Sequence, residues 1–328
     1  MSNTAMSDQY DFITLGEAML RLSPPAYQKI AQAGVFDIQV GGAESNVAIN
    51  LAQLGFRTAW LSRLPDTPLG RRLAAAIAAH GVDIGGVRFV PGERLGLYFI
   101  ELGPPPRPNR VIYDRADSAA SRMSSADVDF ARIAQAGWLH LTGITPALSP
   151  SCRAMAADVL RFARERGLTA SFDVNYRALL WSPSEAAQAL LPLLPLCHYV
   201  FIAHRDGQAL FGAPADAGEA AAALRAQFGC QTLVMTLGEA GAVAQAEDEQ
   251  VSVPQPFHVG QAVDRIGAGD AFAAGFMAAR RWGKSLADAL RYGHALSALK
   301  LTLPGDLALF SRAEVEQLIA GGGQASLR

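Results

Sequence analysis

Short runs rich in β-branched and aromatic residues alternate with longer alanine-rich runs through the middle of the chain. The short runs have the length and composition of buried strands, and the longer runs have the composition of helices. This alternation is typical of a parallel sheet with helices on both faces, in which ligands bind beyond the carboxyl ends of the strands. The predicted strands are Trp138–Thr142, Thr169–Val174, Tyr199–Ile202 and Thr232–Leu237, with helices at Ser151–Arg166, after Pro183 and between the last two strands.

Glycines and a capping pattern mark where several helices end or begin. A helix is commonly closed by glycine, which adopts the left-handed backbone conformation without strain. Ser311 and Glu314 have the spacing of a capping box for a last helix. The glycines that follow apolar helical runs and precede strands are Gly55, Gly81, Gly167 and Gly229.

Two regions break the alternation. Met19–Val40 and Leu95–Arg115 are extended segments with proline-rich turns, notably residues 104–108, and no helix is predicted within them. They predict an antiparallel flap. In the second segment the two-residue period of a strand places Val111, Tyr113 and Arg115 on one face.

The composition sets limits on the partners of the chain. Half of the 328 residues are hydrophobic and the net charge is −2, which gives no electrostatic footprint for nucleic acid or an anionic membrane. We therefore expect small-molecule ligands. The polar stretch Met1–Gln9 has no apolar core for export, and no run reaches the length of a membrane span, so a cytoplasmic protein is predicted. The three cysteines, Cys152, Cys197 and Cys230, are far apart and fit reduced thiols better than disulfides or a zinc site.

The most informative chemistry lies in the segment Asp264–Phe272, where two carboxylates flank a glycine-rich turn before an apolar helical stretch, Ala271–Trp282. Gly267 and Gly269 let the backbone approach a ligand closely and turn its N–H groups toward one point. A helix that begins near Gly269 also favours an anion such as a phosphoryl group at its start. Asp270 then lies where it can accept a proton from an attacking hydroxyl. A tight turn with an acidic helix cap is the simpler alternative.

Other polar positions allow both a functional and an ordinary structural interpretation. Tyr113 and Arg115 can bind a carboxylate or lie on a solvated strand face. Arg177 follows a strand and can bind substrate or form an ion pair with Asp173. Asn46 can bind hydroxyls or cap the helix that follows Gly42. The segment Thr236–Gly241 can leave its backbone open to a nucleotide or form a simple hairpin turn.

The order of these motifs resembles the ribokinase-like (pfkB) family of carbohydrate kinases over essentially the whole chain. The resemblance rests on Gly41-Gly42 with Asn46-x-Ala48, and on Asp264-x-x-Gly267-Ala268-Gly269-Asp270. Within that family the sequence is most similar to 2-keto-3-deoxygluconate kinases. The segments that point to them are Gly16–Pro25, Asn109–Ser121, Asp173–Arg177 with Trp181, Val263–Arg265, and Leu299–Lys300 through Pro304–Asp306.

The resemblance implies an α/β fold with a Rossmann-like, doubly wound, mostly parallel sheet, forming a single domain over residues 1–328. A small β-sheet lid is expected at about residues 17–41 and 95–118. The implied reaction is ATP- and Mg²⁺-dependent phosphorylation of the primary hydroxyl of 2-keto-3-deoxygluconate. Asp270 would be the base, beside an anion hole of backbone N–H groups. The other implied site residues are Gly267, Ala268 and Gly269 in the anion hole, Gly42, Asn46, Tyr98, Tyr113, Arg115 and Arg177 around the sugar acid, and Thr236, Gly238 and Gly241, with Gly267 and Gly269, along the nucleotide.

One motif departs from the family pattern. Where relatives have an asparagine followed three residues later by an acid, which is tied to metal and phosphates, this chain has His204 and Gly207. Two replacements are open: Asp206, one position earlier, can contact a metal-bound water, or Arg205 can contact phosphate directly. We expect weaker magnesium dependence or a raised nucleotide KM. His204 is alternatively an ordinary residue at a helix N-terminus. The second position of the glycine motif, often threonine, is Arg265, as in a subset of the keto-deoxy-gluconate kinases.

Three hypotheses therefore stay open: a keto-deoxy-gluconate kinase, a kinase for a neutral sugar such as fructose, and a binding protein that has lost catalysis. The second predicts that Arg115→Ala changes little, and the third predicts ligand binding without ADP formation. A substrate derived from galactonate fits the first hypothesis equally well. Apolar and aromatic lid residues predict a homodimer or higher homo-oligomer joined through the lids.

Overall fold

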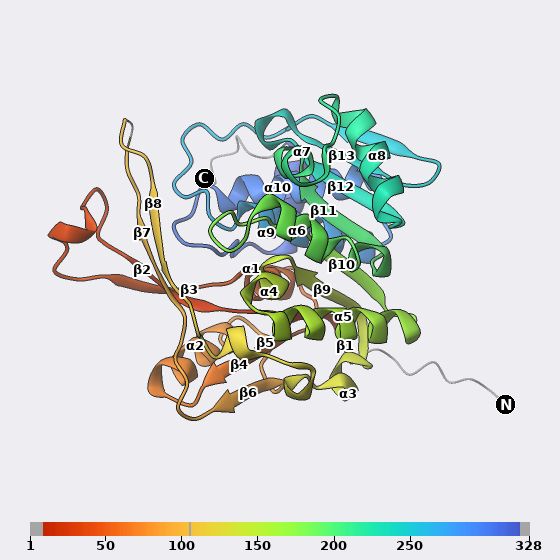
Figure 1. Ribbon diagram of the computed structural model, residues 1–328. Helices are drawn as coiled ribbons and strands as arrows, with labels where there is room; N and C mark the ends of the chain where they lie inside the picture. The colour runs from red at the N-terminus through yellow and green to blue at the C-terminus, as the bar shows by residue number, and fades with distance from the viewer. Residues whose placement is uncertain (1–8, 105, 322–328) are drawn as a thin grey trace.

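The computed structural model describes residues 9–104 and 106–321. It has a large α/β body and a small sheet that projects from one side of it (Figure 1). The prediction for Met1–Gln9 falls almost entirely outside the described residues, as does Pro105 in the proline-rich turn.

The body is built on a ten-stranded sheet within the described residues, and most of its pairs are parallel. Its order is β14-β13-β12-β11-β10-β9-β1-β4-β5, with β6 beside β4; all pairs from β12 to β5 are parallel, and β13 and β14 are antiparallel additions. The predicted doubly wound, mostly parallel sheet is confirmed. The strands are β1 (Tyr10–Leu15), β4 (Thr58–Pro65), β5 (Val82–Asp83), β6 (Val87–Val90), β9 (Ala136–Thr142), β10 (Thr169–Asp173), β11 (Tyr199–Ala203), β12 (Thr232–Thr236), β13 (Ala242–Gln245) and β14 (Gln250–Val253).

Helices cover both faces of this sheet because successive strand residues point to opposite sides. In β1, for example, Phe12 packs into one core with α1, α9 and α10, and Ile13 packs into another with α5, α6 and α8. The helices are α1 (Ala43–Gln53), α2 (Pro68–Ala78), α3 (Phe130–Ile133), α4 (Ile144–Leu148), α5 (Pro150–Glu165), α6 (Pro183–Leu190), α7 (His204–Phe211), α8 (Ala217–Phe228), α9 (Ala268–Arg281), α10 (Leu286–Lys300) and α11 (Arg312–Ile319), with short 3₁₀ turns η1 (Ile30–Gln32), η2 (Ala120–Arg122), η3 (Ser125–Asp127), η4 (Leu194–Leu196) and η5 (Gly238–Ala240).

The predicted helix ends are confirmed. Gly55, Gly81, Gly167 and Gly229 all have positive φ angles, between 63° and 96°, and lie one to three residues after the end of a helix. At the start of α11 the Ser311 side chain accepts from the Glu314 N–H, and the Glu314 carboxylate accepts from the Ser311 N–H. The three cysteines are buried and free, as expected.

The projecting sheet, called the lid below, contains β2 (Met19–Ser23), β3 (Asp37–Gly41), β7 (Leu97–Glu101) and β8 (Arg110–Asp114) in the order β3-β2-β7-β8. The predicted antiparallel flap is correct for its two hairpins and wrong for its centre, where β2 and β7 run parallel. They run parallel because the chain between them crosses the body rather than turning back directly. The predicted absence of helix is also corrected by η1, a single turn between β2 and β3.

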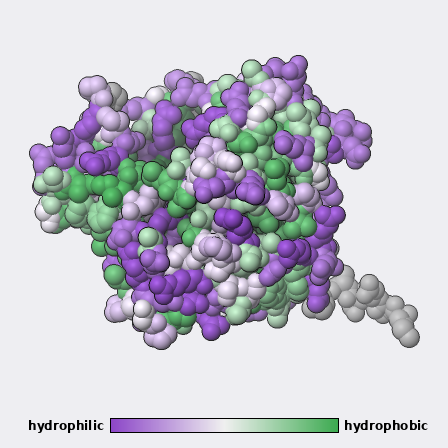
Figure 2. Space-filling view, viewed as in Figure 1, coloured by the Kyte–Doolittle hydropathy of each residue, from purple (hydrophilic) through white to green (hydrophobic). Residues whose placement is uncertain are grey.

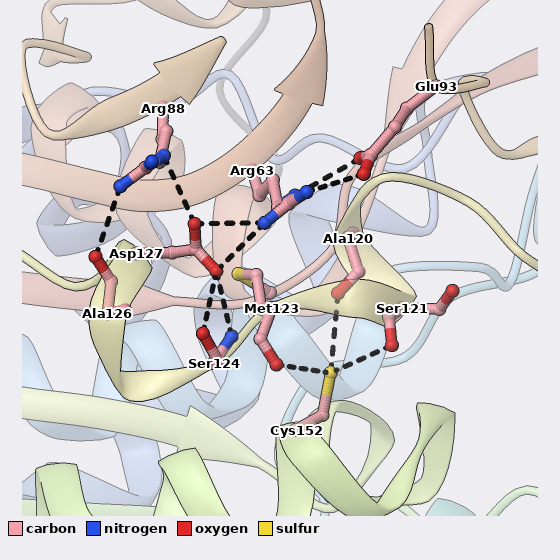
Figure 3. A network of polar contacts seen from close by, with 10 residues as sticks. All are labelled: Arg63, Arg88, Glu93, Ala120, Ser121, Met123, Ser124, Ala126, Asp127 and Cys152. Atoms are coloured by element: carbon pink, nitrogen blue, oxygen red, sulfur yellow. Dashed lines mark hydrogen bonds and ion pairs between the residues drawn. The ribbon is translucent and has the colours of Figure 1, made fainter. Parts of the chain in front are cut away.

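Polar contacts fix the root of the lid to the body. Arg63 of β4 forms ion pairs with Glu93, which precedes β7, and with Asp127 in η3, at 2.5 and 3.0 Å (Figure 3). Nearby, the buried Cys152 thiol donates to the carbonyl oxygen of Ala120 at 3.3 Å. The segments that enter and leave the second lid hairpin are therefore held against the sheet.

Candidate active site

A cavity of about 440 Å³ lies between the lid and the body, beside the carboxyl ends of β10 and β11. Parallel α/β sheets bind ligands at this edge. The residues predicted to bind substrate come from five separate segments, and the structure brings all of them to the wall of this cavity: Gly42, Asn46, Tyr98, Tyr113, Arg115, Arg177 and Asp270.

A second, larger cavity of about 1140 Å³ adjoins the first. Thr236 and Gly238, two of the residues predicted to line the nucleotide, contribute to its wall. Gly241 does not line it: its φ is 117°, and an added Cβ would be 2.3 Å from the carbonyl oxygen of Val253, so this glycine permits a close backbone approach in the β12–β13 hairpin. The two cavities have Ala203, Arg205, Thr236 and Arg265 in common.

The N-terminus of α9 lies where the two cavities meet. Gly267 and Gly269 line the first cavity and Ala268 lines the second. Gly267 has a φ of 80°, and an added Cβ would come within 1.9 Å of the carbonyl oxygen of Asp306, so glycine is required there. The helix begins at Ala268, one residue before the predicted start near Gly269. Its unpaired N–H groups and dipole favour an anion at this junction.

One of the three predicted anion-hole donors has a competing partner. The Ala268 N–H lies 3.4 Å from the carbonyl oxygen of Arg265. Such a weak bond is readily exchanged for a stronger acceptor. Gly269 has open space around its Cβ position, so its backbone is exposed to the first cavity.

Asp270, in the first turn of α9, is 8% exposed and lines the first cavity. Burial raises the pKa of its carboxyl to about 6, although the hydrogen bond from Asn46 and the charge of Arg177 act in the opposite direction. The Asn46 Nδ2 donates to Asp270 Oδ2 at 2.7 Å, and its Oδ1 accepts from the Gly42 N–H at 3.4 Å. Asn46 thus orients the carboxylate as well as lining the cavity.

This arrangement, a buried carboxylate at a helix N-terminus between two connected cavities, is that of a site for group transfer between two ligands. Comparison with known proteins identifies it further, because residues 11–311 match the profile of the pfkB family carbohydrate kinases. The chain belongs to the pfkB family of carbohydrate kinases. The resemblance seen in the sequence is therefore confirmed.

Relatives of this pfkB kinase match it over nearly the full length. It is 41% identical to a 2-dehydro-3-deoxygalactonokinase of Haloferax volcanii, over 95% of this chain and 97% of the relative. It is 33% identical to a 2-dehydro-3-deoxygluconokinase of Bacillus subtilis, over 90% and 91%. The crystal structure of a 2-dehydro-3-deoxygluconokinase of Thermotoga maritima is 32% identical, with a TM-score of 0.87 over 94% of this chain and 99% of that one.

The Arg115 side chain lines the first cavity of this pfkB kinase, but it is already paired with another protein side chain, which the sequence did not predict. Its guanidinium is bound by the carboxylate of Glu17, with Nε 2.9 Å from Oε2 and a second, closer contact from Nη2. Ser118 donates to the other oxygen of Glu17 at 2.6 Å. The predicted neighbour relation is confirmed, since Arg115 lies over the Tyr113 ring at 5.4 Å. Glu17 was missed because the pairing partner lies 98 positions away.

The Arg177 side chain, in contrast, has neither a hydrogen bond nor an ion pair among the described residues, so the alternative ion pair with Asp173 does not form; only its backbone carbonyl is bonded, accepting from the Leu180 N–H at 2.9 Å. Asp173 accepts the N–H of Asn175 at 3.0 Å instead. Burial and then the charge of Asp270 raise the pKa of Asp173 to about 7, and the charge of Arg177 acts against this rise. The charge of the exposed guanidinium therefore acts on both carboxylates, and the side chain remains available to a ligand.

The segment that departs from the family pattern forms the first turn of α7. The Nε2 of His204 is 2.9 Å from the carbonyl oxygen of Pro214, which supports its ordinary structural role at a helix N-terminus. Gly207 is buried, and a Cβ there would be 2.9 Å from Leu224 Cδ1. Asp206 lines the first cavity and pairs with Arg205 at 3.5 Å. Within residues 9–104 and 106–321, no group of three or more His, Cys, Asp and Glu side chains is arranged to hold a metal.

A buried charge network behind the anion hole was not predicted. Arg21 of β2 forms ion pairs with Asp264 and Asp306, at 2.5 and 2.7 Å. Tyr98 donates to the second oxygen of Asp306 at 2.7 Å, and Lys300 donates to the backbone carbonyl of Asp264 at 2.8 Å. Tyr98, predicted to hold the substrate, is thus 3% exposed and engaged with the protein.

The described part of the chain holds no helix that is both long and apolar enough to span a bilayer.

Proposed function

We propose that this pfkB kinase transfers the γ-phosphoryl group of ATP to the terminal primary hydroxyl of a 2-keto-3-deoxy sugar acid, with 2-keto-3-deoxygluconate as the substrate predicted from the sequence. The observation that carries the proposal is the position of Asp270. Its buried carboxylate lies on the sugar side of a helix N-terminus that separates two connected cavities. The free, buried cysteines suit the cytoplasm as the site of the reaction.

In this proposal the sugar occupies the cavity under the lid, and the nucleotide occupies the larger cavity beside Thr236 and Gly238. Asp270 accepts the proton of the hydroxyl while the oxygen forms its bond to the γ-phosphorus and the bond to the β–γ bridging oxygen breaks. Asn46 holds the carboxylate in place. The N-terminus of α9 stabilises the negative charge that develops on the phosphoryl oxygens. The lid limits the access of water, which would otherwise accept the phosphoryl group.

The acidic groups beside the cavity fit a magnesium ion. Mg²⁺ in such sites keeps several waters and takes one or two carboxylates together with phosphate oxygens, so a three-residue cluster is not needed. Asp206 is the residue we assign to it, through water, because its side chain is 14% exposed and lines the cavity. When bound, the ion neutralises charge on the nucleotide phosphates.

Recognition of the substrate carboxylate is assigned mainly to Arg177. Arg115 already shares its charge with the buried Glu17, so its contribution is to shape the wall together with Tyr113. A free guanidinium binds a carboxylate through two parallel hydrogen bonds. The names of the Haloferax and Bacillus relatives support a keto-deoxy sugar acid, and they differ in the C4 configuration, so the galactonate-derived acid belongs to the proposal.

A second candidate function follows from the same Glu17–Arg115 pair. Because Glu17 neutralises the arginine nearest to Tyr113, a neutral sugar such as fructose meets no uncompensated charge at that wall. This alternative gives Arg177 no carboxylate to bind.

The test is ADP release from ATP and Mg²⁺ with 2-keto-3-deoxygluconate, 2-keto-3-deoxygalactonate, fructose and ribose, for the wild type and for Arg177→Gln. We expect turnover confined to the keto-deoxy acids, and roughly a tenfold to hundredfold loss of kcat/KM in Arg177→Gln, because a charged hydrogen bond contributes about 1.5–3 kcal/mol. Arg161→Gln removes an arginine that is 57% exposed on α5, outside both cavities, and is the matched control.

Turnover of fructose or ribose at rates that Arg177→Gln leaves unchanged would transfer the assignment to the neutral-sugar kinase. Binding of the sugar acid without any ADP release would instead support the third hypothesis, a protein that has lost catalysis.

A further inference from the structure

Lys300 is the last residue of α10 and has no exposed surface. It is one of three lysines in the chain. Burial of an ammonium group is costly unless it is paired and hydrogen-bonded. The Nζ of Lys300 donates to the backbone carbonyl of Asp264 at 2.8 Å, three residues before the glycine at which the anion hole begins.

The surroundings of this ammonium group are charged and enclosed. The carboxylates of Asp264 and Asp306 both attract it, and Arg21, which is paired with both, repels it. Burial lowers the pKa of Lys300, while these two carboxylates raise it. The same Asp306 supplies the backbone oxygen against which Gly267 packs. The ammonium is therefore part of the support on which the glycine turn rests.

The influence of Lys300 also reaches the proposed base. Its positive charge acts to lower the pKa of the Asp270 carboxyl. The buried cluster then contains two cations, Arg21 and Lys300, and three carboxylates, those of Asp264, Asp270 and Asp306. Without Lys300 the net charge of the cluster would be one unit more negative. A phosphoryl group, which is itself negative, would then meet stronger repulsion at the helix N-terminus.

We propose that Lys300 is a positioning residue for phosphoryl transfer, which fixes the Asp264 carbonyl and places a positive charge behind the anion hole. The inference rests on the proposed function, because it assigns Lys300 a role in the same reaction at Asp270. A fixed charge in a site that excludes water stabilises charge in the transition state without reorganisation cost. No ligand needs to contact Lys300 for this effect.

The test compares Lys300→Met with Lys284→Met across pH, using the substrate that the wild type turns over. Lys284 follows the opposite end of α9, about 20 Å away for a helix of this length, so the control loses the same charge far from the site. We expect kcat to fall roughly tenfold to a hundredfold in Lys300→Met, as for loss of a preorganised electrostatic contact. Lys284→Met is expected to match the wild type.

The position of the acidic limb of the pH profile separates an electrostatic role from a merely structural one. The charged groups that influence Asp270 are Arg177, Asp306, Lys300 and Asp173. Loss of Lys300 alone should raise the pKa of Asp270 and move the acidic limb of kcat/KM upward by about one pH unit. Lys300→Arg, which keeps the charge, should leave the limb where it is in the wild type.

Folding of each variant is checked by circular dichroism, and Lys300→Gln replaces Lys300→Met if the latter does not fold. An unchanged acidic limb and rate in the folded uncharged variant, with an active wild type, would overturn the role of Lys300 while leaving the proposed function intact. Equal shifts in Lys300→Arg and in the uncharged variant would also overturn it, because the charge would then not matter. An inactive wild type would instead be a failure of the proposed function.

Discussion

At the scale of single residues, Asp270 shows how burial prepares a weak acid for proton transfer. An exposed aspartate titrates near pH 4 and is a poor base. Desolvation between the two cavities raises the pKa of Asp270 to about 6, and the hydrogen bond from Asn46 limits the rise. The carboxylate thus stays ionised at neutral pH and gains basicity.

This predicts a pH dependence with a definite sign. The base works when deprotonated, so kcat/KM should be constant above neutral pH and should fall as pH drops through about 6. Asp270→Asn should lower kcat by at least about a hundredfold, to the point of abolishing measurable turnover. Sugar binding, measured by calorimetry, should be retained. The control is Asp248→Asn, in the exposed turn between β13 and β14. An active Asp270→Asn enzyme would remove the basis for the assignment.

Residues far apart in the sequence account for what could not be predicted at this scale. Gly267 and Asp270 could be predicted because a glycine turn and a helix start are specified by consecutive residues. The pairs Glu17–Arg115 and Arg21–Asp264 join positions 98 and 243 apart. No local pattern specifies such partners, so Arg115 was predicted to bind a carboxylate or to lie on a solvated strand face, and the pairing of Arg21 was not predicted.

At the scale of elements, the start of α9 depends on one backbone conformation. Gly267 caps the helix with a φ of 80°, in the region that favours glycine, and packs against the Asp306 carbonyl. Gly269, two residues later, has neither constraint.

Gly267→Ala should therefore displace the turn, lower the free energy of unfolding by about 1–3 kcal/mol and reduce kcat strongly. Gly269→Ala is the matched control for stability, and in urea unfolding it should differ little from the wild type. Equal stability of the two alanine variants would contradict the proposed packing of Gly267 on Asp306.

The four strands predicted with bounds correspond to β9, β10, β11 and β12, and the helix predicted at Ser151–Arg166 corresponds to α5. Their ends agree to within two residues, because hydrophobic runs and helix caps are local signals. The parallel pairing of β2 with β7 could not be predicted, since it depends on where the long crossover between them returns. The weaker magnesium dependence expected from His204 and Gly207 stays a prediction. Gly207 is buried against Leu224, so an acidic side chain at position 207 would require its neighbours to move.

At the scale of the whole molecule, the lid leaves apolar side chains in contact with solvent. Val35 before β3, Ile38 in β3 and Ile112 in β8 are 68%, 41% and 41% exposed. Figure 2 shows hydrophobic surface along the projecting sheet at the left of the view. β3 and β8 are also the edges of that sheet, with backbone groups open to pairing.

We therefore propose, as the sequence predicted, that two copies associate through their lids. Light scattering of the wild type should give a dimer or a higher oligomer, and Ile38→Lys should shift it toward the monomer. Leu179→Lys, at a residue that is 79% exposed and outside the lid, is the control and should not change the mass. A monomer at every concentration tested would contradict the proposal.

The bonds of Arg21 and Tyr98 to Asp306 have a mechanical consequence for the lid. Each of the two central lid strands is clipped at one side chain to the loop behind the anion hole. A sheet anchored at both central strands resists rotation as a rigid body about its attachment. Closure over the sugar is therefore expected to come from bending of the outer parts of the two lid hairpins, while the anchored ends of β2 and β7 stay in place.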